Sequence, residues 1–413
     1  MRRVSTDMMN TDMQYWLRRR EDAMAAQESR MNRQERLNGL RDDPLAAARS
    51  VRYESVVGRL ERYEDNVRYT LDRSRIAEGY MRQAQDIMQR VRELAVTGAT
   101  GTFTKEDTAA MAVEVDQLLA ELVSLANARG PDGDFLFAGD KSHTEPFRAL
   151  TSFVEGAGGP AVTAVDYLGG LGTPRAEISE ASYLPMNLPG DSVFWAERQR
   201  IAGGADATGY RVLEASSIFL DGQEIRLRPG DTVQAIIAKI NDSGAPVKAS
   251  LDPSRNALVL EGTNAHRLRV EDGSGARVLA DLGILSGSGV PSDYAPTARV
   301  SGGSIFDTVI ALRDALNKGD HLDVGGRVLA SLDAGMGNLG ARLAEAGSMM
   351  ERLEMAGLRL NKEIPDTTAL LAAEKDLDFA QAVTDLKMME YARTASLQMA
   401  GRVLPQTLLD FLK

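Results

Sequence analysis

Three aspartates, Asp132, Asp134 and Asp140, lie close together near predicted turns, where carboxylates could hold a cation. Their spacing lacks the closing bidentate glutamate of a calcium loop, so we interpret them as acidic residues of surface turns. Histidine and cysteine give no clearer candidate, because the 413-residue chain has no cysteine and three scattered histidines. The sequence therefore predicts neither a metal site nor a disulfide.

A second candidate is the stretch 335–340, which reads Gly-Met-Gly-Asn-Leu-Gly and has the spacing of a dinucleotide-binding loop. Such a loop joins a strand to the N-terminus of a helix, whereas Met336 and Leu339 fall on the apolar face of a helical pattern. Small residues that let helices pack closely explain these glycines better. No serine, histidine and carboxylate can be placed in one pocket, so we expect no catalytic residue, no cofactor and no enzyme.

The composition argues against two classes of partner, nucleic acids and membranes. A formal net charge of −11 argues against a nucleic-acid binder, whose contact surface is usually basic. No apolar run approaches the length that a membrane span needs, so we expect no membrane insertion. Arg2 and Arg3 are followed by polar residues where a signal peptide has its apolar segment, so we expect no cleaved signal peptide.

Long helical patterns occupy both ends of the chain. From Tyr53 to Ala95, apolar residues recur every three or four positions, which predicts a helix on the order of 70 Å long that begins near Pro44. Thr104–Asp107 resembles a capping box before a second helix, and Pro365 is expected to interrupt the last long pattern. The residues expected in the core of this bundle are Leu60, Val67, Leu71, Met81, Met88, Leu118, Leu122, Leu339, Leu343 and Met350.

The middle of the chain has a different composition, with frequent glycine and proline and short β patterns. Residues 217–220 and 224–227 flank Asp221-Gly222 and predict a hairpin with a tight turn. A short amphipathic helix, Thr232 to Ile240, precedes a further strand pair at 247–251 and 257–261. These elements predict a compact α+β insertion.

The predicted fold is mainly α: a long antiparallel helical bundle or coiled coil formed by the N- and C-terminal segments, with an inserted α+β domain. We expect three domains. They comprise a terminal helical domain (1–42 with 368–413), a long-helix bundle (43–146 with 297–367) and the insertion (147–296).

Apolar stripes near the two ends are the candidate functional feature. On the C-terminal helix the stripe is broken once, by Arg393, and no such narrow stripe is able to bury itself alone. We therefore expect a protein that packs against neighbours, through a packing interface made of Met13, Leu17, Met24, Val383, Leu386, Met389, Leu397, Leu404, Leu408 and Phe411.

Several motifs together resemble the flagellin superfamily and, within it, the hook-associated protein 3 family of hook–filament junction proteins. They are Met1-Arg2-Arg3-Val4-Ser5-Thr6, Asp42-Asp43-Pro44-Leu45-Ala46-Ala47-Ala48-Arg49, Phe135-Leu136-Phe137-Ala138-Gly139 and Leu408-Leu409-Asp410-Phe411-Leu412. Residues 218–285 are similar to the insertion module of many flagellins, through Asp221-Gly222, the helix 235–241, Leu258-Val259-Leu260 and Leu282-Gly283-Ile284. Pro405 departs from the pattern, because it lies inside the terminal helix.

The resemblance implies a structural adaptor that joins the hook to the flagellin filament, with the terminal helices forming an inner tube. Its implied partners are other copies of itself in a ring-like layer, flagellin, a neighbouring hook-associated protein and an export chaperone. It further implies export through the flagellar type III apparatus to an extracellular or periplasmic flagellum. The alternatives are a filament flagellin and a cytoplasmic coiled-coil scaffold.

Overall fold

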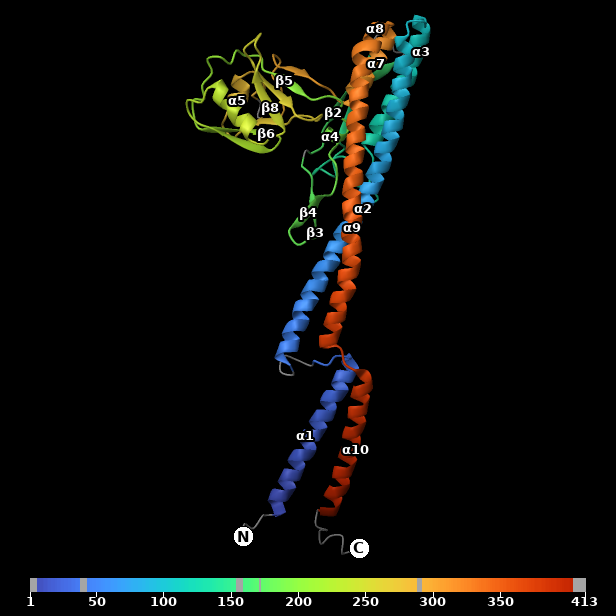
Figure 1. Ribbon diagram of the computed structural model, residues 1–413, viewed down its shortest axis with the longest axis vertical. Coiled ribbons are helices and arrows are strands. Elements are labelled where there is room, and N and C mark those ends of the chain that lie inside the picture. The colour runs from blue at the N-terminus through green and yellow to red at the C-terminus, as the bar shows by residue number, and fades with distance from the viewer. Residues whose placement is uncertain (1–5, 38–42, 154–158, 171, 288–291, 404–413) are drawn as a thin grey trace. The chain divides into compact units, whose positions relative to one another are not determined.

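The computed structural model describes residues 6–37, 43–153, 159–170, 172–287 and 292–403 (Figure 1). Of the residues described, 56% are helical, with long helices toward both ends and small antiparallel sheets between them, as the sequence predicts. The longer helices are α1 (Thr6–Arg33), α2 (Pro44–Ala99), α3 (Lys105–Ala126), α5 (Val233–Asp242), α7 (Ile305–Lys318), α9 (Leu329–Lys375) and α10 (Phe379–Val403). The short ones are α4 (Gly190–Val193), α6 (Val278–Asp281), α8 (His321–Asp323) and a π-helical turn, η1 (Val324–Val328).

Every sheet is antiparallel. Two are two-stranded hairpins: β1 (Phe147–Phe153) with β2 (Pro160–Tyr167), and β3 (Arg175–Ser179) with β4 (Ser182–Pro185). The other two have the orders β10-β6-β7 and β11-β5-β9-β8. Their strands are β5 (Arg200–Ala202), β6 (Ser216–Leu220), β7 (Gln223–Leu227), β8 (Val247–Leu251), β9 (Leu258–Gly262), β10 (Val270–Asp272) and β11 (Arg299–Ser301).

Contacts divide the chain into two compact units. Unit 1 comprises Met1–Asp65 and Gly357–Lys413, and unit 2 comprises Asn66–Ala356. The helices α2 and α9 each contribute one part to unit 1 and the other to unit 2.

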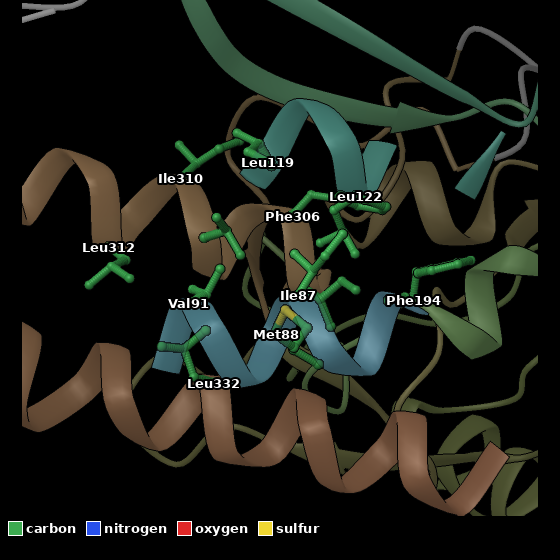
Figure 2. Close-up of a cluster of buried hydrophobic side chains, with 14 of the residues drawn as sticks. Ile87, Met88, Val91, Leu119, Leu122, Phe194, Phe306, Ile310, Leu312 and Leu332 are labelled. Atoms are coloured by element: carbon green, nitrogen blue, oxygen red, sulfur yellow. The ribbon is translucent and has the colours of Figure 1, made fainter. Parts of the chain in front are cut away.

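The main core of unit 2 lies between α2, α3, α7 and α9 (Figure 2). Apolar residues recur on one side of each helix, so the four helices bury their stripes against one another. Gly335 on α9 permits close packing, because a Cβ there would lie 2.9 Å from the Ile305 side chain on α7. The buried side chains shown include Ile87, Met88, Val91, Leu119, Leu122, Phe194, Phe306, Ile310, Leu312 and Leu332.

A second core lies within the middle of the chain, between the two larger sheets, α5 and α6. The predicted β6–β7 hairpin is present, with Asp221 and Gly222 at positive φ in its turn. Asn241 ties α5 to β8: its side-chain amide donates to the Ala249 carbonyl, and its oxygen accepts from the Ala249 N–H. The predicted short helix and the predicted strand pair (β8 with β9) are therefore confirmed as well.

Of two predicted helix boundaries, the one at Thr104 is confirmed and the one at Pro365 is wrong. Thr104 caps α3 in a capping box with Asp107, as predicted. The expected interruption at Pro365 is wrong, because α9 continues through this residue to Lys375. Pro365 is exposed, so water is able to satisfy the carbonyl group whose helical hydrogen bond the proline removes.

Candidate assembly surface

In unit 1, α1 and α10 lie side by side and antiparallel (Figure 1). The Arg20 guanidinium donates to the Ala392 carbonyl at 2.8 Å, and the Gln27 amide donates to the Ala382 carbonyl at 3.3 Å. Residues further along α1 contact residues earlier in α10, which shows that the two helices run antiparallel. This helix pair brings together the two predicted stripes.

The facing sides of the pair form a partly buried seam. Most of the predicted interface residues lie there half-buried: Met13, Leu17, Met24, Val383, Leu386 and Met389. Leu397 is 49% exposed, and Leu404, Leu408 and Phe411 lie outside the described residues, as does Pro405. Among the described residues, neither buried core cluster includes a side chain of α1 or α10, so apolar burial in the seam is modest.

A second apolar face runs along α10, turned away from the seam. Met388, Tyr391 and Met399 are 59%, 75% and 72% exposed. At 100° per residue these three fall on one side of the helix, opposite Leu386 and Arg393. We call Met388, Tyr391 and Met399 the outer face of α10. Exposed apolar side chains grouped in this way typically mark an interaction surface.

The helix α1 also exposes large aromatic side chains. Tyr15 and Trp16 are 59% and 57% exposed, and their rings meet edge to face. The Arg19 guanidinium lies over the Trp16 ring, 5.5 Å from its centroid. An arginine stacked on an exposed indole leaves a broad flat surface that suits a protein partner.

The charge of unit 1 suits contact between copies. By sequence, unit 1 contains 20 lysines and arginines against 20 aspartates and glutamates, so it is neutral, and unit 2 carries the whole net charge of −11. Neutral surfaces do not repel one another, and a net charge near zero promotes association. Unit 1 is therefore the better suited of the two for self-association.

A charged cluster joins the ends of the helices in unit 1. The Arg36 N–H donates to the Lys375 carbonyl, and the Leu377 N–H donates to the Gln34 carbonyl. Lys375 forms ion pairs with Glu54 and Glu35, at 2.8 Å and 3.1 Å. Hydrogen bonds to Glu54 and then to Glu35 raise the pKa of Lys375. The connection after α1 and the connection before α10 therefore hold each other in place.

The predicted bundle-core residues occupy the inner sides of their helices to different degrees. Five are buried: Val67, Met81, Met88, Leu122 and Leu339. The other five are partly buried: Leu60, Leu71, Leu118, Leu343 and Met350.

Several buried residues of unit 2 were not predicted from the sequence. Phe147, Phe194 and Phe306 are buried and pack ring against ring, with centroids 5.1–5.7 Å apart. Arg313 is 1% exposed in its side chain and pairs with Asp116 and Asp314. These residues lie far apart in the chain or interrupt an apolar pattern, so no helical or strand periodicity marked them.

Two of the three aspartates of the turn region, Asp132 and Asp134, have different side-chain partners. Asp132 accepts hydrogen bonds from Tyr69 and from the buried Arg73, and the Tyr69 hydrogen bond is the main cause of its lowered pKa. Asp134 contacts His143 at 2.7 Å. Within the ranges that the structure describes, no group of three potential ligand residues could hold a metal ion. The same ranges contain no helix that is both long and apolar enough to span a membrane.

Two parts of the chain match known protein families. Residues 4–142 match the family model of the bacterial flagellin N-terminal helical region, and residues 221–264 match that of the flagellin hook IN motif. Flagellin D of Vibrio anguillarum is 23% identical over 393 residues, which cover 95% of this chain and 94% of that protein. The chain is therefore similar to bacterial flagellins in its N-terminal helices and in part of its middle region.

Two further matches carry the hook-associated name. Flagellar hook-associated protein 3 of Escherichia coli K12 is 24% identical over 153 residues, 37% of this chain and 44% of that protein. The crystal structure of hook-associated protein 3 from Legionella pneumophila has a TM-score of 0.47 and 18% identity, covering 78% of this chain and 97% of that one. The N-terminal family match includes α1, α2 and α3, so the candidate assembly surface and the bundle both draw on the matched region.

Proposed function

We propose that this protein is a structural adaptor of the bacterial flagellum, which joins the hook to the flagellin filament through another hook-associated protein. The observation that carries the proposal is the pairing of α1 with α10, which leaves an exposed apolar outer face on a neutral unit. The matches to flagellin models and to hook-associated protein 3 support it. In this role the protein is a building block and not an enzyme.

The terminal helices, residues 1–42 with 368–413, form the inner layer of the assembly in this proposal, as an antiparallel coiled-coil pair. Residues 43–146 with 297–367 form the surrounding bundle, and residues 147–296 form an outward insertion. Copies associate head to tail in a ring-like layer, because closed two-fold pairs would stop the growth of a tube. Flagellin, a neighbouring hook-associated protein and an export chaperone are the expected partners, and export needs no cleaved signal peptide.

Deleting the gene tests this role. The adaptor role predicts cells that keep their hooks, lack filaments and release unassembled flagellin into the medium. Complementation with the intact gene should restore filaments, which controls for effects on neighbouring genes. Filaments of normal length and number on the deletion strain would overturn the proposal.

A filament flagellin is the second candidate, favoured by the alignment with flagellin D over 95% of this chain. The two roles differ in copy number, since a filament subunit is present in many copies and a junction protein only in one short layer. Quantifying the protein in sheared filaments separates them. If it is the bulk protein there, it is a flagellin. Its presence only inside the cell would favour the cytoplasmic scaffold.

A further inference from the structure

Three polar side chains cross the seam between α1 and α10. Gln27 is 7% exposed, and its amide reaches the carbonyl of Ala382, a residue small enough to leave room for it. Arg20 donates to the Ala392 carbonyl and to the Ser396 hydroxyl. Arg393, which breaks the apolar stripe, pairs with Glu21 at 3.4 Å. Each contact joins residues more than 350 positions apart in the chain.

The apolar part of the seam does not choose an alignment by itself. On α1 the seam residues Leu17, Met24 and Met31 are spaced by seven. A shift of α10 by one heptad therefore replaces each of them with an equivalent apolar side chain. Methionine adapts its shape to different neighbours, so the shifted packing costs little. The register must be set by polar contacts: the backbone hydrogen bonds between residues 34–36 and 375–377 at one end of the pair, and polar side chains along the rest of it.

The polar contacts distinguish the alignments. A shift by one heptad places Met389 or Lys375 opposite Gln27 in place of Ala382. The first of these shifts places Val403 opposite Arg20 in place of Ser396, and the second places Met389 there. The first shift also brings Glu28 to Arg393, and the second brings Asp385 to Arg20. Either shift still offers backbone carbonyls to Gln27 and Arg20 and supplies one new ion pair. It loses the Ser396 hydroxyl, the pairing of Arg393 with Glu21 and the room that Ala382 leaves for the Gln27 amide.

We propose that Arg20, Gln27 and Arg393 are positioning residues that, together with the backbone hydrogen bonds of residues 34–36 to 375–377, fix the register of α1 against α10. A hydrogen bond from a buried side chain changes such an equilibrium by about fivefold. Contacts as exposed as those of Arg20 and Arg393 add about twofold each. Because a shifted alignment recovers one ion pair, the three together favour the observed register by roughly tenfold. The inference does not depend on the flagellar role, since it concerns one chain only.

Register matters because it decides which exposed side chains share one surface. The outer face of α10 and the aromatic pair Tyr15 and Trp16 on α1 keep a fixed relation only in one alignment. A shift by one heptad would displace them by about 10 Å along the helix axis. An assembly that repeats one contact between copies needs this relation to be the same in every copy.

Disulfide mapping on the full chain tests the proposal, because the chain contains no cysteine of its own. Leu386→Cys is combined with Leu17→Cys, Met24→Cys or Met31→Cys in three separate proteins. The pair 24 and 386 lies between the Gln27 and Arg20 contacts, whereas the other two pairs report shifts by one heptad in either direction. The proposal predicts that the pair with Met24→Cys cross-links at least about tenfold faster than the other two.

The same three pairs are then placed in a chain carrying Arg20→Met, Gln27→Met and Arg393→Met. Methionine keeps helix propensity and apolar contact, so the helices should still pair, while the preference for the pair with Met24→Cys falls about tenfold relative to the chain without these substitutions. The control is Arg18→Met with Lys387→Met, two exposed positions outside these contacts, and it should keep the tenfold preference. Equal or absent cross-linking in the wild-type chain would overturn the proposal. So would an unchanged preference, or a loss of helix by circular dichroism, in the triple variant.

Discussion

The double substitution Met388→Ala with Tyr391→Ala should weaken self-association without unfolding the chain. Both side chains lie on the outer face of α10, 59% and 75% exposed, so they make few contacts within one copy. Full burial of such side chains contributes about 1.5–3 kcal/mol each, and about two-thirds of that remains to be gained on association. Alanine also retains helix propensity, so the helix itself should be unaffected.

The loss for the two positions together is about 2–4 kcal/mol per contact, which corresponds to a 30- to 1000-fold weaker association. Sedimentation of the purified chain over a concentration series measures it, as an increase in the concentration at which assemblies form. Leu213→Ala is the matched control, because Leu213 is 87% exposed but lies in unit 2. A double variant that assembles within threefold of the wild-type concentration would refute the assignment of this face.

Two further predictions concern stability. Gly139→Ala should lower the free energy of unfolding by about 2 kcal/mol or more in urea titrations, because φ is +63° and a Cβ would lie 2.1 Å from the Gly170 carbonyl oxygen. Gly133→Ala, at positive φ with open space around it, should lower the free energy of unfolding by about 1 kcal/mol. Equal losses of unfolding free energy in the two variants would contradict the clash at Gly139. The free energy of unfolding should also lose the contribution of Asp191 as the pH rises from about 4 through 7, because burial raises the pKa of this carboxyl to about 7. His266 adds a further loss above about pH 6.5: burial lowers the pKa of its imidazole, but the hydrogen bond and charge of Asp221 outweigh burial and raise the pKa overall. Both groups hold a proton in the folded state that the unfolded chain has released, so Asp191→Asn should flatten the decline, and an unchanged slope would contradict the sign.

The local signals in the sequence predicted local structure well. Thr104 and Asp107 stand at capping-box spacing, and Asp221-Gly222 sits between two β patterns, so the α3 start and the β6–β7 hairpin followed from neighbouring residues alone. Pro365 misled the analysis because an exposed proline loses one hydrogen bond without ending a long helix that is stabilised by its packing.

Features that depend on distant residues were not predictable in the same way. The ring cluster of Phe147, Phe194 and Phe306 joins residues from separate elements, so no spacing marks it. A search for one stripe on α10 found the seam, and it missed the second face of the same helix at Met388 and Tyr391. Arg393 was noticed as a break in the stripe, but only its pairing with Glu21 shows what it does there.

If this protein forms a layer between hook and filament, a label attached to it should mark that boundary. Leu213→Cys introduces a single thiol at an exposed position away from unit 1, and a gold or fluorescent label on it marks the protein on isolated flagella. Label is expected in one narrow band at the hook–filament boundary of every flagellum. Label spread along the filament, or absent from flagella and confined to the cell interior, would contradict it.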